Sequence, residues 1–228
     1  MTPQAMEKFR EKYRAAIAPS YSGWLHMLFV VVVGLSVIIY GLLNTHQPSW
    51  LEWLVFPLTM LLVNFAEYYA HRWLGHRKTK YGKLFYQRHS GDHHSFFLEH
   101  AMPYQSVRDW RVVLFPGYLI IAFILGLVLP GGWLLMQIAT DNIAFLFGSA
   151  AISGYLFYEV MHFSYHLPDG SFVEKTPFWR ALRQLHVEHH KRDLMAQKNF
   201  NITLPIFDWI FGTYHLPQDW RDSKRNKK

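Results

Sequence analysis

The chain has 228 residues, of which 51% are hydrophobic and 18% aromatic, and its formal net charge is +7. The length fits a single domain, and the absence of cysteine excludes disulfides, thiolate zinc sites and cysteine nucleophiles. The apolar residues are concentrated in long uncharged runs, which indicates an integral membrane protein rather than a soluble one.

The first 22 residues predict an amphipathic N-terminal segment. Thr2 and Pro3 are typical of a helix N-cap and a first helical position. One face of the helix is apolar and carries Met6, Phe9, Tyr13 and Ile17. Two interpretations stay open, a helix lying on the membrane surface and a short solvated helix.

Four apolar segments follow, each long enough to span a hydrocarbon core of about 30 Å. They are Trp24–Leu43, Leu54–Ala66 extended by Trp50–Trp53 and Tyr68–Ala70, Val112–Pro130, and Trp133–Phe157. We expect outer turns at Asn44–Pro48 and in "LPGGW", residues 129–133. Asp141 and Asn142 then fall mid-membrane, where a polar pair is a functional candidate or a helix-packing hydrogen bond. The sequence therefore predicts an all-α fold with about four transmembrane helices.

Lysine and arginine mark the sides of the membrane. Of the 23 such residues, 4 lie in Met1–Ser22, 8 in His71–Arg111 and 11 after His166, and the expected outer turns contain none. The positive-inside rule places both termini and the central loop in the cytosol. The basic charge then reflects topology and anionic lipid headgroups, so no nucleic-acid partner is expected. We interpret residues 1–228 as one multi-pass membrane domain that ends in a basic tail, residues 217–228.

Ten of the 14 histidines fall in four clusters on the predicted cytosolic side. The clusters are His71 and His76 in "HRWLGH", His89, His93 and His94 in "HSGDHH", His162 and His166 in "HFSYH", and His186, His189 and His190 in "HVEHH". Spacings of three and four residues aim side chains from one helical face at one point. His71 and His76 are five apart, which fits a straight helix poorly, so we expect the helix to end or loosen near Gly75.

Such clusters predict a metal centre, because a multivalent cation satisfies several neutral imidazole lone pairs together. Ten ligands exceed what one ion accepts, so we expect two metal ions in a cytosolic helical cap. An all-imidazole site suits zinc, iron, copper or nickel, and the spacing does not choose among them.

The series H-x4-H, H-x3-HH, H-x3-H and H-x2-HH resembles the fatty acid hydroxylase/sterol desaturase superfamily of membrane di-iron oxygenases. The stretch "NFNITLPIFDWIFGTY", residues 199–214, is similar to the one that follows the last histidine box there, and the resemblance covers roughly residues 25 to 215. Two departures are an extra residue in the second box, where H-x2-HH is commoner, and Asn201 where glycine is frequent. The resemblance implies two iron ions, O2 as co-substrate, and hydroxylation or desaturation of a membrane lipid such as a fatty acyl chain, sphingolipid or sterol.

Metal-bound histidines need hydrogen-bond acceptors that fix their tautomers. The candidates are Glu67, Asp92, Glu159, Glu188 and Asn199. Glu159 and His162 also match the E-x-x-H spacing of carboxylate di-iron bundles, so Glu159 is a possible direct ligand, although a supporting role is favoured. We predict no catalytic residue beyond the metal ligands and no organic cofactor site.

The sequence has neither the HPGG motif of a fused cytochrome b5 nor a GxGxxG motif, so we expect a separate electron donor of the cytochrome b5, ferredoxin or reductase type. Three alternatives stay open: a carotenoid hydroxylase of similar chemistry, a non-enzymatic metal transporter, and a bis-histidine haem protein. A zinc metalloprotease is disfavoured because no HExxH occurs.

Overall fold

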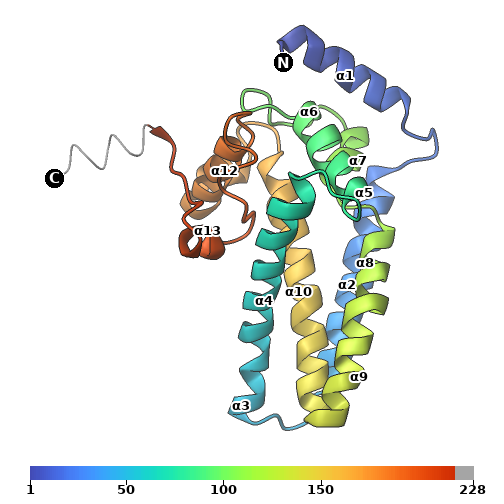
Figure 1. Cartoon of the computed structure of the whole chain (residues 1–228). Helices are drawn as coiled ribbons and strands as arrows, with labels where there is room; N and C mark the ends of the chain where they lie inside the picture. The colour runs from blue at the N-terminus through green and yellow to red at the C-terminus, as the bar shows by residue number, and fades with distance from the viewer. Residues whose placement is uncertain (219–228) are drawn as a thin grey trace, which may run out of the picture.

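The computed structural model describes residues 1–218, and every regular element in that range is a helix. Four segments are long and apolar enough to cross a membrane: Gly23–Leu43, Trp50–Gly75, Val107–Ile138 and Asp141–Tyr165. They run side by side, and the smaller helices gather at one end of the bundle, in what we call the cap (Figure 1). The all-α prediction with four spans is thus confirmed. Most of the predicted tail 217–228 lies outside the described residues.

Two of the four spans, the second and the third, are built from more than one helix. The first is α2 (Gly23–Leu43), and the second joins α3 (Trp50–Trp53), α4 (Val55–Tyr69) and the π-helix η1 (Ala70–Gly75). The third joins η3 (Val107–Asp109), α7 (Trp110–Val113), α8 (Tyr118–Phe123), the π-helix η4 (Ile124–Val128) and α9 (Leu129–Ile138), and the fourth is α10 (Asp141–Tyr165). The cap adds α5 (Lys83–Tyr86), the π-helix η2 (Gln87–His93), α6 (His94–Phe96), α11 (Phe172–Lys175), α12 (Pro177–His189) and α13 (Ile206–Ile210).

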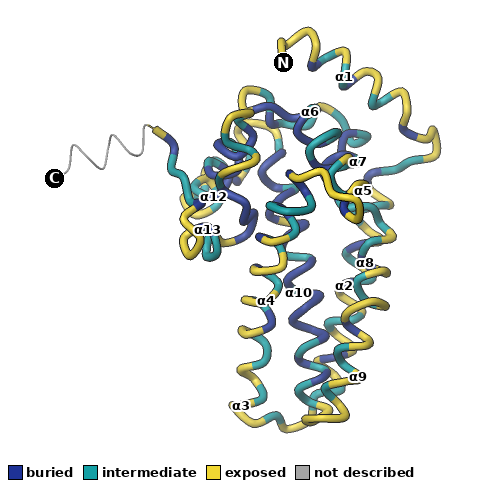
Figure 2. Tube along the Cα trace, in the orientation of Figure 1, coloured by how far each residue is buried: buried dark blue, intermediate teal, exposed yellow. Residues whose placement is uncertain are grey.

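Helix α10 is the centre of the bundle and packs against α2, α4 and α9. It is the most buried of the four spans, whereas α4 and α9 expose much of their surface (Figure 2). Small residues allow the close approach, as where Gly154 meets Val63 on α4 and Gly34 on α2 meets Leu156. The apolar side chains that point outward match a hydrocarbon environment, so a lipid bilayer completes the burial.

The expected turn in "LPGGW" is wrong, because residues 129–133 lie inside the third span. Neither Gly131 nor Gly132 has a positive φ, so no tight turn uses them. Gly131 instead gives room to the Phe147 ring, which a Cβ atom would approach to 2.9 Å. Pro130 stands where η4 passes into α9, a junction of π- and α-helix at which a missing N–H is tolerated.

The actual turn lies at Ala139–Thr140, and this corrects the position of the polar pair. Thr140 is the N-cap of α10, and its side chain accepts a hydrogen bond from the Ile143 amide. Asp141 and Asn142 are therefore at the end of the fourth span opposite the cap rather than mid-membrane (Figure 1). Asn142 exchanges two hydrogen bonds with the backbone of His46, which ties the two outer connections together.

The N-terminal helix α1 (Pro3–Ala15) begins as predicted, with Thr2 as its N-cap. Its apolar face packs on the cap, where Phe9 and Tyr13 join a buried cluster that includes Phe96. Arg10 is buried at this contact and donates through Nε to the carbonyl of Phe96 at 2.9 Å. The helix thus contributes its apolar face to the cap instead of leaving it free for solvent.

We predict that Gly41→Leu destabilises the bundle. A Cβ atom there would lie 2.9 Å from the carbonyl oxygen of Phe145, a backbone atom that cannot move aside, so α2 must shift from α10. Overpacking of this kind costs about 1–3 kcal/mol. Thermal unfolding in detergent should show a lower midpoint than in the wild type. The matched control is Gly126→Leu, where a Cβ meets no atom within 4 Å; equal midpoints for the two variants would contradict the packing argument.

Candidate metal centre

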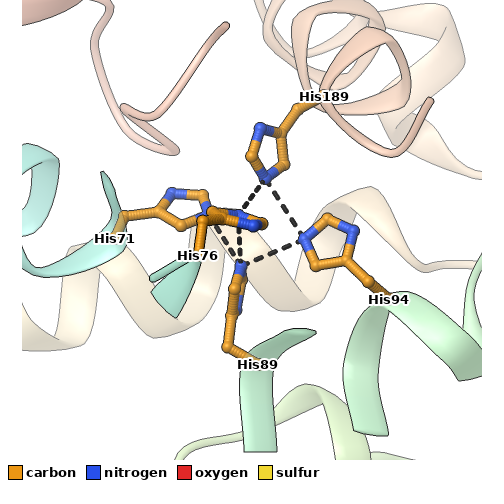
Figure 3. Close-up of side chains that lie close together, drawn as sticks. All are labelled: His71, His76, His89, His94 and His189. Carbon is orange, nitrogen blue, oxygen red and sulfur yellow. Dashed lines mark hydrogen bonds between the residues drawn. The ribbon is translucent and has the colours of Figure 1, made fainter. Parts of the chain in front are cut away.

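All ten predicted histidines are buried at the cap end of the bundle. Nine of them form two groups in which the ligating nitrogens lie within 4.8 Å of one another. The first group is His71, His76, His89, His94 and His189, and the second is His93, His166, His186 and His190. Nε2 of His162 lies 3.2 Å from Nε2 of His93, so the tenth ring borders the second group. Figure 3 shows the rings of the first group with their nitrogens converging.

Two π-helices position the first group. A π-helix closes i→i+5 hydrogen bonds, so residues five apart lie on one face. His71 and His76 are related in this way at η1, and His89 and His94 at η2. The expected loosening near Gly75 is confirmed, since η1 ends there. A Cβ on Gly75 would lie 3.0 Å from the His89 ring, so glycine leaves room for the imidazoles.

The second group uses α-helical spacing instead. His186 and His190 are four residues apart on α12, and their Nε2 atoms are 3.0 Å apart. We expected His189 to point at the same place as His186 and His190. In the structure it points into the first group instead, and its Nε2 lies 3.0 Å from Nε2 of His76. Consecutive helical residues are about 100° apart, so adjacent residues face different groups. His93 and His94 divide in the same way.

Backbone carbonyls hold the protons of five rings in place. The Nδ1 atoms of these histidines donate to carbonyl oxygens: His71 to Phe200, His93 to Val112, His166 to Met102, His189 to Lys198 and His190 to Phe97. A carbonyl oxygen only accepts, so each Nδ1 carries the hydrogen and each neutral Nε2 carries a lone pair. This is the tautomer in which a histidine binds metal through Nε2.

The Nε2 lone pairs face one another. His93 and His190 both donate from Nδ1 to carbonyls, yet their Nε2 atoms are only 3.2 Å apart. Neither ring has an Nε2 hydrogen to share, so the contact is repulsive unless a cation or proton lies among the nitrogens. The donor sets therefore fit two metal ions, one in each group.

Burial keeps the rings neutral, which is the metal-binding form. Desolvation lowers the pKa of His93 to about 3 and that of His189 to about 4. The same cause lowers the pKa of the other cap histidines: His76, His89, His94, His166, His186 and His190.

A loop after α12, residues 198–203, supplies two of the carbonyls. Asn199 has φ 56°, in the left-handed region that asparagine tolerates, and the carbonyls of its neighbours Lys198 and Phe200 reach His189 and His71. The Asn199 side chain donates to the carbonyl of Leu185 at 3.1 Å. Asn199 therefore acts on the histidines through the loop shape and not by contact.

Two carboxylates fix this loop. Glu67 on α4 accepts from the amides of Ile202 and Thr203 and, at 2.6 Å, from the Thr203 hydroxyl. Asp208 on α13 accepts from the amides of Phe200 at 2.9 Å and Asn201 at 2.8 Å. Asp208 was missed in the sequence, although it is the one charged residue in the otherwise uncharged stretch 202–213, which is the signal that could have found it.

The other three predicted supporting carboxylates lie elsewhere. Asp92 accepts from Gln87, and Glu188 pairs with Lys191 and lies 3.8 Å from His215. Glu159 accepts from the Phe115 amide at 3.2 Å, in the break between α7 and α8, and is in neither metal group. Within residues 1–218, no hydrogen bond or ion pair joins any of these carboxylates to the ten histidines, because carbonyls take that place.

Two neighbouring cavities reach the histidines. The cap cavity, about 250 Å³, lies between α5, η2 and the start of α8 and is bordered by His89, His93 and His162. The bilayer cavity, about 390 Å³, lies among α4, α8 and α10, is lined almost wholly by apolar side chains, and reaches His71. They share the walls Phe85, Phe115, Leu119 and Tyr158.

Sequence comparison places this site in a known context. The sequence profile of the fatty acid hydroxylase family matches residues 56–213, a range that contains all ten histidines. The chain is 29% identical over 167 residues to a dihydroceramide fatty acyl 2-hydroxylase of Arabidopsis thaliana, which covers 70% of this chain and 63% of the relative. A fatty acid 2-hydroxylase of Mus musculus is 26% identical, over 72% of this chain and 40% of the relative.

A Delta(7)-sterol 5(6)-desaturase of Gibberella zeae is 28% identical, over 78% of this chain and 43% of the relative. The chain thus spans less than two thirds of the length of each of these three proteins. The fold is similar to that of full-length Scs7p, in which only the hydroxylase domain is visible. The TM-score is 0.59 at 23% identity, over 86% of this chain and 68% of that one.

We predict that the metal-free protein loses stability as the pH falls from about 6.5 toward 4. The folded pKa of each cap histidine lies below the unfolded value of about 6.5, so the unfolded chain binds more protons in this window. Each histidine then removes up to about 1.4 kcal/mol of stability per pH unit. Thermal unfolding followed by tryptophan fluorescence measures this. The exposed His100 is the control, since His100→Ala should leave the slope unchanged; a flat profile between pH 7.5 and 5 would refute the burial of neutral rings.

We also predict that Asp208→Asn weakens metal retention in the first group. The variant loses a charged acceptor for the loop that holds His71 and His189, and supporting contacts of this kind change metal affinity by about 10- to 100-fold. Metal content after dialysis against a chelator should fall toward half of the wild-type value. Asp193→Asn, an exposed residue nearby, is the matched control. Retention equal to the wild type would show that Asp208 does not support the group.

Proposed function

Because the chain belongs to the fatty acid hydroxylase family, we propose that it is an O2-dependent di-iron oxidoreductase that hydroxylates or desaturates a C–H bond of a membrane lipid. The observation that carries the proposal is the bilayer cavity, a mainly apolar space among the spans that reaches His71 of the first group. A hydrocarbon chain can stay in apolar surroundings along this path while one of its carbons approaches the metal groups.

The two groups would hold one iron each, with His162 as a further ligand of the second. When bound, the irons supply the reductive activation of O2. The protein supplies neutral ligands, because carbonyls fix the Nδ1 hydrogens and burial keeps the rings unprotonated. Its cap also excludes bulk water from the ten rings, each of which is less than a tenth exposed.

The relatives favour an acyl chain as the substrate. Two of them are named for 2-hydroxylation of a fatty acid or fatty acyl group, and the third for desaturation of a sterol. We therefore place hydroxylation of a fatty acyl chain first and sterol desaturation second. A carotenoid hydroxylase would use the same cavity and remains a lower-ranked variant of the same chemistry.

The geometry disfavours the two non-enzymatic alternatives. A metal transporter needs ligands along the membrane path, whereas the histidines gather at one end of the spans. A bis-histidine haem protein needs a gap of porphyrin width between rings, whereas neighbouring Nε2 atoms lie 2.7–3.2 Å apart. Both alternatives also leave most of the ten histidines without a role.

We propose that the cap and both termini lie on the cytosolic side. The connections at the end opposite the cap, residues 44–49 and 139–140, contain no lysine or arginine, and the 18 such residues within residues 1–218 lie toward the cap. Electrons would come from a donor of the cytochrome b5, ferredoxin or reductase type, for which a cytosolic cap is accessible.

The test combines metal content with isotope incorporation. Purified protein should contain close to two irons, and ¹⁸O from ¹⁸O2 should appear in a hydroxylated lipid, or two hydrogens should be lost on desaturation. His94→Ala and His186→Ala, one in each group, should each remove about one iron and lower turnover more than about 100-fold. His46→Ala, at the outer end, is the control. Product formation under nitrogen, or full activity of both variants, would falsify the proposal.

A further inference from the structure

Arg88 is an unpaired cation in the wall of the cap cavity. It precedes His89 in η2 and lines the cavity beside three of the histidines. Its one hydrogen bond runs from Nη2 to the carbonyl of Arg111 at 3.0 Å. Among residues 1–218, no carboxylate lies within 4.0 Å of this half-buried guanidinium.

A second arginine, Arg111, lies close to Arg88 but is not among the residues that line the cap cavity. Arg111 is on α7, and its charge opposes that of Arg88. Its Nη1 atom is buried without a hydrogen-bond partner. Two adjacent arginines, one with an orphaned donor, form an arrangement that is costly unless an anion completes it.

Some of the other sheltered arginines are paired with carboxylates. Arg14 binds Asp109 at 2.7 Å, and Arg183 binds Glu174 at 2.5 Å and Asp169 at 3.1 Å. Neither Arg88 nor Arg111 forms such a pair within residues 1–218. A guanidinium presents several donors in a planar fork that suits carboxylate and phosphate oxygens.

The rest of the cap cavity is mainly apolar, and Phe85, Phe115 and Leu119 line both this cavity and the bilayer cavity. A ligand that fills both spaces has an anionic head at Arg88 and a long apolar chain. Since Arg88 and His89 are consecutive, the head lies close to the metal groups.

We infer that Arg88, with Arg111 beside it, binds the anionic head of an amphiphilic substrate and places carbons near that head at the metal centre. The inference rests on the proposed function and narrows its substrate to lipids with a carboxylate or phosphate head. It makes Arg88 a specificity-determining residue, because an uncharged headgroup leaves the two guanidiniums unpaired.

Binding without turnover tests the inference. The iron-loaded full chain is placed in phosphatidylcholine nanodiscs without O2, and octadecanoate, octadecyl phosphate and octadecanol compete with a radiolabelled octadecanoate. At least one anionic probe should bind roughly 10- to 100-fold more tightly than the alcohol. Whichever of octadecanoate and octadecyl phosphate binds more tightly identifies the headgroup as a carboxylate or a phosphate. Equal affinity of all three probes would overturn the inference.

Variants assign the effect to Arg88. Arg88→Gln should bring the anionic probe to the affinity of octadecanol and leave octadecanol binding unchanged, and Arg88→Lys should restore part of the difference. The matched control is Arg77→Gln, an exposed cap arginine over the Trp73 ring, which should behave as the wild type. The inference fails if Arg88→Gln weakens acid and alcohol equally, or if Arg77→Gln has the same effect.

Iron content and aerobic turnover of the same samples separate the two proposals. Selective anion binding in a protein that never oxidises a lipid would retain the headgroup site and reject the proposed function. Lipid oxidation with no preference for an anionic head would retain the proposed function and reject the headgroup site.

Discussion

The structure depends on ten buried imidazoles whose Nε2 atoms point at one another. Such an arrangement is unfavourable in isolation, since each ring is desolvated and its Nε2 atom meets another Nε2 instead of a donor. The surrounding protein therefore has to hold the rings against their mutual repulsion. For five rings it does so through carbonyl acceptors on Nδ1, and a cation in each group would turn the repulsion into coordination.

Irregular helices make this arrangement possible. An α-helix alone would carry residues five apart to different faces, whereas the π-helices η1 and η2 bring His71 over His76 and His89 over His94. The extra residue in the second histidine box is accommodated in η2. Adjacent histidines then serve different groups, so the two groups are joined by single peptide bonds and cannot move independently.

The sequence predicted the four spans and the gathering of ten histidines at one end of them. Both predictions use side-chain properties that the sequence shows directly, hydrophobic runs and histidine spacing. The turn in "LPGGW" was misplaced, since proline and glycine also occur in membrane helices where a large ring such as Phe147 packs on them. The division of His189 and His190 between groups depends on how α12 is rotated, which tertiary packing decides. The carbonyls that support the rings were not predictable, because every residue has one and only the fold selects Lys198 and Phe200.

The position of α12 near the end of the chain has a consequence for biosynthesis. The first histidine group is complete only when residue 189 has been made and the second only when residue 190 has been made, and the carbonyl of Phe200 follows later. The last span ends at Tyr165, so synthesis of all four spans precedes closure of the centre. Metal binding by a complete group would thus follow translation of the membrane domain, and a nascent chain that ends before residue 186 holds at most seven of the ten histidines with neither group complete.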